Sequence, residues 1–118
     1  MNRIHAVNPD QPLFIHYTPG GTHAPHHPTP EWTKKISDMN LFDKGWNALR
    51  DDIFANQKRL GVVPQNCQLT TRSEGIPAWT DLTDDARTVA ARLMEVYAGF
   101  AEHTDHYAGV LVDALEHM

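Results

Sequence analysis

The sequence predicts an α/β protein, and three observations support this fold class. Residues 12–17 read P-L-F-I-H-Y, a short apolar and aromatic run with turn-forming residues on both sides, which is typical of a strand. The nearly continuous apolarity predicts burial on both faces, as in a parallel sheet. Residues 43–60 and 84–117 carry apolar side chains at intervals of three and four, which is typical of helices.

The predicted helices have recognisable ends. Asp43 is expected to cap the helix at 43–60, and Gly61 follows its last residue. Thr83 is expected to cap the long helix, which contains no proline. At 1.5 Å per residue that helix would be about 50 Å long. A compact domain of this length has a diameter of only about 35 Å.

The predicted strand has no partner in the sequence. A buried strand needs neighbours on both edges for its backbone N–H and C=O groups. The chain therefore either associates through this strand or forms part of a larger α/β protein.

Composition excludes several classes of function. The net charge of −5 argues against nucleic acid as the main partner. No apolar run approaches the roughly 20 residues that span a bilayer, and none near the N-terminus indicates a signal peptide. The single cysteine, Cys67, excludes an intrachain disulfide and a thiolate metal cage. The cellular compartment stays open.

Histidines are the unusual feature, with 8 in 118 residues. Three of them, His23, His26 and His27, lie in a loop at 18–30 that is rich in proline and glycine and follows the predicted strand. In open α/β sheets such loops line the active site. Imidazole can act there as general acid, general base or metal ligand. A solvated polar loop is an equally open interpretation. A short helix is expected next, at 31–36.

Four segments of the chain, taken in sequence order, resemble corresponding segments of one protein family. They are P-L-F-I-H-Y-T-P-G-G-T-H-A-P-H-H (12–27), F-D-K-G-W-N-A-L-R-D-D-I-F-A-N-Q-K-R-L-G-V-V-P (42–64), G-I-P-A-W-T-D-L (75–82) and M-E-V-Y-A-G-F-A-E-H-T-D-H-Y-A-G (94–109). Together they are similar to the central segment of type I sulfatases, the arylsulfatase group of the alkaline-phosphatase-like superfamily.

The resemblance implies an α/β/α sandwich, of which residues 1–118 would be a partial catalytic domain, incomplete at both ends. It implies hydrolysis of a small-molecule sulfate ester to an alcohol or phenol plus sulfate, using a formylglycine and a calcium ion. His23 occupies the position of the histidine that protonates the leaving oxygen. His26 and His27 would contribute to substrate binding at the rim of the pocket, while His16, inside the strand segment, is expected to pack.

The departures from the family pattern are equally clear. The formylglycine motif requires proline two residues and arginine four residues after the cysteine, whereas Cys67 is followed there by Leu69 and Thr71. The resemblance therefore places both the formylglycine and the calcium ligands outside this segment, with no metal ligand inside it. We expect the isolated chain to be inactive and the remainder of the catalytic domain to be needed, with no nucleic acid or membrane partner.

The same residues are also compatible with a second function. A non-catalytic, helical metal-binding or interaction protein would use His23, His26 and His27 as ligands. His103 or His106 could then complete the set, and the acidic C-terminal helix would serve as a partner surface. Asp105, beside His106, is expected to be structural, with a carboxylate–imidazole network as the alternative. A degraded sulfatase gene is a third hypothesis.

Overall fold

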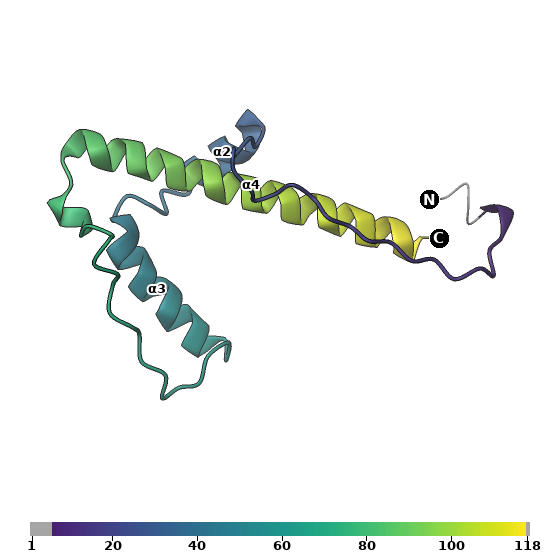
Figure 1. Cartoon of the computed structure of the whole chain (residues 1–118), viewed down its shortest axis with the longest axis horizontal. Helices are drawn as coiled ribbons and strands as arrows, with labels where there is room; N and C mark the ends of the chain where they lie inside the picture. Colours follow the sequence, from purple (N-terminus) through teal and green to yellow (C-terminus); the bar gives the residue numbers. More distant parts are fainter. Residues whose placement is uncertain (1–5, 118) are drawn as a thin grey trace.

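The computed structural model describes residues 6–117, which form helices joined by loops, with no β-strand among them (Figure 1). In chain order the elements are α2 (Pro30–Ser37), α3 (Gly45–Arg59), the 3-10 helix η1 (Trp79–Asp81) and α4 (Asp84–Glu116). The molecule measures 61 × 38 × 25 Å, with a Cα radius of gyration of 19.5 Å. A compact chain of this length would have about 13–14 Å. The helices therefore do not enclose a single core.

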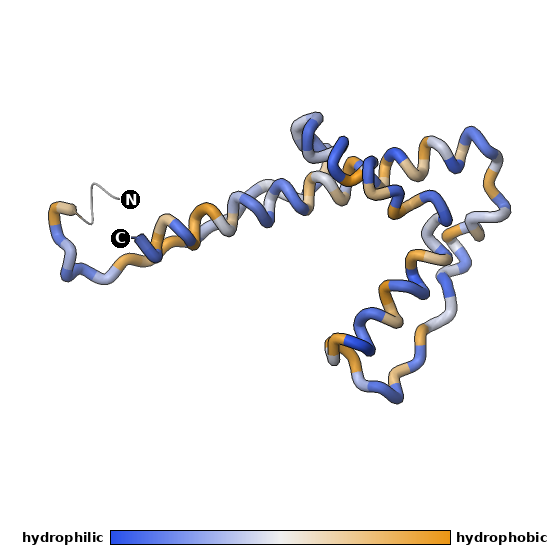
Figure 2. Tube along the Cα trace, turned by 180° about the vertical axis from the view of Figure 1, so that it is seen from behind, coloured by the Kyte–Doolittle hydropathy of each residue, from blue (hydrophilic) through white to orange (hydrophobic). Residues whose placement is uncertain are grey.

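The predicted strand at 12–17 is wrong for this structure. The segment has no ladder partner and runs beside the C-terminal half of α4 (Figures 1 and 2). Phe14 is 90% exposed, so the expected burial on both faces is wrong as well. The physical reason is that a strand depends on hydrogen bonds to a neighbour, which the described part of the chain does not supply. The mostly helical result is compatible with a segment of a larger fold, and the α/β/α sandwich stays a prediction.

α2 packs across α4. Pro30 starts the helix at a position where its missing N–H costs nothing. Thr33 and Ile36 face α4 and are buried. Gly99 of α4 permits the close approach, because a Cβ there would lie 3.1 Å from the backbone of Thr33. This crossing fixes where the loop that carries His23, His26 and His27, which leads into α2, meets α4.

α3 extends as a separate arm (Figure 1). The expected cap at Asp43 is wrong, because Lys44 occupies the cap position and no side chain caps the helix. Gly45 starts the helix with φ of +75°, against the Trp79 ring. The Trp46 indole donates to the Pro77 carbonyl at 3.1 Å and meets the Trp79 ring edge to face. The two tryptophans thus join the arm to η1.

α4 confirms the expected long helix. The Thr83 hydroxyl accepts the Ala86 N–H at 3.2 Å, so this predicted cap is confirmed. Apolar residues recur along the helix (Figure 2). They are only partly covered, since Val89 is 60% and Leu93 62% exposed. No helix within residues 6–117 combines the length and apolarity needed to cross a membrane.

Candidate functional site: a histidine loop docked on α4

The histidine loop, defined here as residues 18–29, connects the extended N-terminal segment to α2. The His23 N–H donates to the Gly20 carbonyl at 2.8 Å, which closes a turn around the two glycines. Pro25 and Pro28 fix φ further along and exclude helix within the loop. The loop therefore has a defined path, with the histidines carried between proline-restrained points.

The imidazole of His23 is exposed and oriented locally. Its Nδ1 lies 2.5 Å from the carbonyl oxygen of Ala24. A carbonyl oxygen can only accept, so the proton of the neutral ring belongs on Nδ1 in this geometry. Nε2 is then left free to gain and release a proton. Chemically, this arrangement suits a general acid that uses Nε2.

His26 and His27 are brought together, but His23 is not brought to them. Both line a cavity of about 560 Å³ that Lys34 and Arg92 also line, and His23 is not among its lining residues. His26 is half-buried and His27 exposed. The three histidines that are neighbours in the sequence thus face two different environments.

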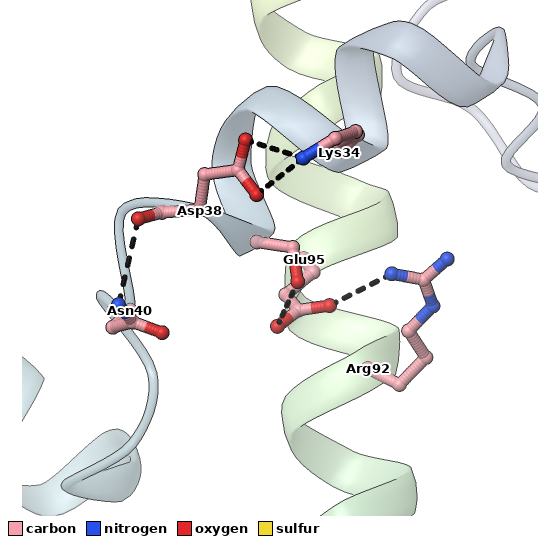
Figure 3. A network of polar contacts seen from close by, with 6 residues as sticks. Lys34, Asp38, Asn40, Arg92 and Glu95 are labelled. Carbon is pink, nitrogen blue, oxygen red and sulfur yellow. Dashed lines mark hydrogen bonds and ion pairs between the residues drawn. The ribbon is translucent and has the colours of Figure 1, made fainter.

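The cavity wall is a network of paired charges (Figure 3). Lys34 donates to both carboxylate oxygens of Asp38 at 2.7 Å. Arg92 donates to Glu95 at 2.9 Å, and the Ser37 hydroxyl donates to the other Glu95 oxygen at 3.2 Å. Because Lys34 and Arg92 each have a carboxylate partner, the wall is polar and its positive charges are neutralised.

α4 provides the surface on which the loop rests. A Cβ on Gly21 would lie 1.9 Å from the Thr104 hydroxyl oxygen, so only glycine fits there. The Thr22 hydroxyl donates to the Tyr97 hydroxyl at 3.1 Å. The His26 ring meets Tyr97 edge to face, with ring centroids 5.0 Å apart. Tyr97 and Thr104 appear in the sequence as ordinary members of a helical stripe, and no local signal marks them as loop contacts.

A second aromatic cluster joins α2 to α4. Trp32 stacks on His103 with ring centroids 5.4 Å apart and lies 5.1 Å from the His106 ring. Lys35 forms an ion pair with Glu102 and lies over the Trp32 ring. These contacts make Trp32 an anchor between α2 and α4 and give His103 and His106 a packing role.

Asp105 is exposed, and no hydrogen bond or ion pair of its carboxylate is found within residues 6–117. The structure therefore gives no support to a carboxylate–imidazole network through Asp105. His16 is also exposed, so the expectation that it packs is wrong, because no strand neighbour covers its segment.

One carboxyl group near the loop has a shifted pKa. Hydrogen bonding with the Thr29 side chain, and then with its own backbone N–H in the first turn of α2, lowers the pKa of Glu31. Desolvation opposes this lowering, and the electrostatic effect of His103 adds to it. Glu31 thus stays ionised at the N-terminus of α2, where the helix dipole favours a negative charge.

The donor set does not fit a metal centre. Within residues 6–117, His, Cys, Asp and Glu side chains form no group of three or more that could hold a metal ion. The metal-binding alternative therefore gains no support from the geometry. The calcium ion and formylglycine of the sulfatase resemblance find no fitting residues here either, and Cys67 is half-buried beside the Gln68 carbonyl.

Comparisons with known proteins agree with the sequence resemblance. The chain is 32% identical over 95 residues to an uncharacterized sulfatase of Schizosaccharomyces pombe, covering 79% of this chain and 17% of that protein. It is 26% identical over 113 residues to an arylsulfatase of Klebsiella aerogenes, covering 96% of this chain and 24% of that protein. Both matches support a sulfatase family relationship. No family model matches the sequence, and no solved structure matches it significantly.

The two sulfatase matches cover only a small part of each relative. The matched regions make up a quarter or less of these two sulfatases. The second match includes almost the whole chain, and so the histidine loop together with α2, α3 and α4. The relationship is therefore to one segment of a sulfatase that contains the candidate loop.

Proposed function

We propose that this chain is the central segment of an arylsulfatase-type catalytic domain, in which His23 protonates the leaving oxygen of a sulfate ester. The match to two sulfatases across most of the chain carries the proposal. The orientation of His23 supports it, because the Ala24 carbonyl holds Nδ1 and leaves Nε2 free. The remainder of the catalytic domain would supply the groups that attack sulfur, and the isolated chain would be inactive.

In this proposal the overall reaction converts a sulfate ester and water to an alcohol or phenol and sulfate. As the bond from sulfur to the ester oxygen breaks, negative charge develops on that oxygen. The protonated His23 ring donates its Nε2 proton there, and the proton is later regained from water. A general acid placed within hydrogen-bond reach of the leaving oxygen suits this step. His26 and His27 would contribute to substrate binding at the edge of their cavity.

The first test is to sequence the DNA on both sides of this reading frame. The proposal expects an upstream C/S-x-P-x-R motif and further sulfatase sequence downstream, all in frame. Stop codons on both sides, without these motifs, would contradict it.

The second test is His23→Ala in that longer protein. Loss of a general acid typically lowers kcat by about 100-fold or more, measured with 4-nitrophenyl sulfate and with an ester whose alcohol is less acidic. The loss should be larger for the less acidic alcohol, because that leaving group needs the proton more. His117→Ala, at the far end of α4, is the matched control and should keep normal kcat. A His23→Ala enzyme with unchanged kcat on both esters would refute the assignment.

A further inference from the structure

Tyr97 contacts the histidine loop on both sides of His23. Thr22, directly before His23, donates its hydroxyl proton to Tyr97 Oη at 3.1 Å. His26, three residues after His23, places its ring 5.0 Å from the Tyr97 ring at an interplanar angle of 85°. One side chain on α4 therefore joins two points of the loop that enclose His23.

The remaining contacts of the loop explain why this matters. The bonds from His23 to Gly20 and Ala24 are local, so they shape the turn without placing it on α4. Placement on α4 comes from Gly21 against Thr104, from the His26 ring near Phe100, and from Tyr97, which alone contacts two points of the loop. The Tyr97 contacts can be weakened in graded steps without forcing atoms to overlap, because its hydroxyl and its ring can be removed in turn.

We propose that Tyr97 is a positioning residue that docks the histidine loop on α4 and thereby orients the His23 imidazole. Its hydroxyl holds Thr22, and its ring edge holds His26, which also lies 6.2 Å from the Phe100 ring. The link to proton transfer rests on the proposed function, whereas the docking of the loop does not.

The test uses Tyr97→Phe, Tyr97→Leu and Thr22→Val in the chain as described. Tyr97→Phe and Thr22→Val remove the same hydrogen bond from opposite ends, while Tyr97→Leu also removes the ring contact with His26. Tyr97 is 49% exposed on the helix surface, so α4 should keep its structure. Circular dichroism at 222 nm checks that it does.

The first readout is hydrogen exchange of the His23 amide, which is bonded to Gly20 in the docked loop. We expect its protection to fall about fivefold in Tyr97→Phe and in Thr22→Val, as one ordinary hydrogen bond predicts. The double variant Tyr97→Phe/Thr22→Val should show no further loss, because both changes remove one bond. Tyr97→Leu should show a larger loss than either single variant.

The second readout is the tautomer of His23, measured by nitrogen-15 NMR of the imidazole. The docked loop predicts a proton on Nδ1, and undocking should move the population toward Nε2. Tyr107→Phe is the matched control, since Tyr107 is a similarly exposed tyrosine of α4 that contacts His103 and His106. It should leave both readouts unchanged.

Unchanged His23 exchange and tautomer in all three Tyr97 and Thr22 variants would overturn the proposal. So would an equal effect of Tyr107→Phe, because the change would then reflect the helix and not Tyr97. Failure of the proposed function looks different: His23→Ala would leave sulfatase turnover of the longer protein intact while Tyr97 still controlled the loop.

Discussion

At the scale of single residues, the structure divides three histidines that the sequence places together. His26 packs on α4 and lines a cavity with His27, whereas His23 is held only by its own loop. The sequence could mark all three as candidates because their residue type and loop position are local properties. It could not distinguish them, because what sets His26 apart is its ring contact with Tyr97, a residue far away in the chain.

Glu31 gives a prediction about pH at this scale. Its pKa is below the usual 4.5, chiefly through hydrogen bonding with the Thr29 side chain. A lowered pKa in the folded state means that the carboxylate stabilises the fold above pH 4.5 and that this contribution is lost as the pH falls through the folded-state pKa. We therefore expect Glu31→Gln to lower stability at pH 7 and to flatten the loss of stability between neutral and acid pH.

Urea unfolding followed by circular dichroism at 222 nm, at a series of pH values, measures this effect. Glu74→Gln, at an exposed position outside the helices, is the control. If wild type and Glu31→Gln lost stability in parallel on acidification, the role assigned to the Glu31 carboxylate would be wrong.

At the scale of elements, the helices were predictable and the strand was not. The stop at Gly61 and the cap at Thr83 depend on nearby residues, and both appear as expected. The segment at 12–17 has the apolarity of a buried strand, but a strand exists only with a neighbour. The cap at Asp43 failed for a related reason, because the Trp79 ring fixes the start of α3 from a distance.

The two glycines of α4 test how α2 is held. Nothing lies within 4 Å of a Cβ added at Gly109, so Gly109→Ala should stabilise the helix by about 0.5–1 kcal/mol. The same Cβ at Gly99 would press on the Thr33 backbone at 3.1 Å. Gly99→Ala should therefore gain less than Gly109→Ala, and Gly99→Leu should separate α2 from α4.

Thermal unfolding by circular dichroism gives the helix stability, and the NMR signal of the Trp32 indole N–H reports whether Trp32 still stacks on His103. Equal stabilisation by Gly99→Ala and Gly109→Ala, with the Trp32 signal intact, would show that α2 does not pack closely at Gly99.

At the scale of the whole molecule, much apolar surface is uncovered. The accessible surface is 9102 Å², whereas a compact protein of this length exposes about 6,500 Å². The difference exceeds the roughly 800 Å² that one partner buries in a standard interface. An excess of this size is expected for a chain that packs against further protein, as the sulfatase segment that we propose would.

Leu93 tests that interpretation, because it is 62% exposed in α4 here. In the isolated chain, Leu93→Glu should change the free energy of unfolding by no more than about 0.5 kcal/mol, as at other exposed sites. In the longer protein that we propose, the same position would be buried, and an unpaired carboxylate should cost about 3 kcal/mol or more. Urea unfolding of both proteins measures the two values.

The control is Thr88→Glu, at an exposed polar position of the same helix, which should have a small effect on the free energy of unfolding in both proteins. A mild Leu93→Glu effect in the longer protein would mean that the rest of the domain leaves this face of α4 in solvent.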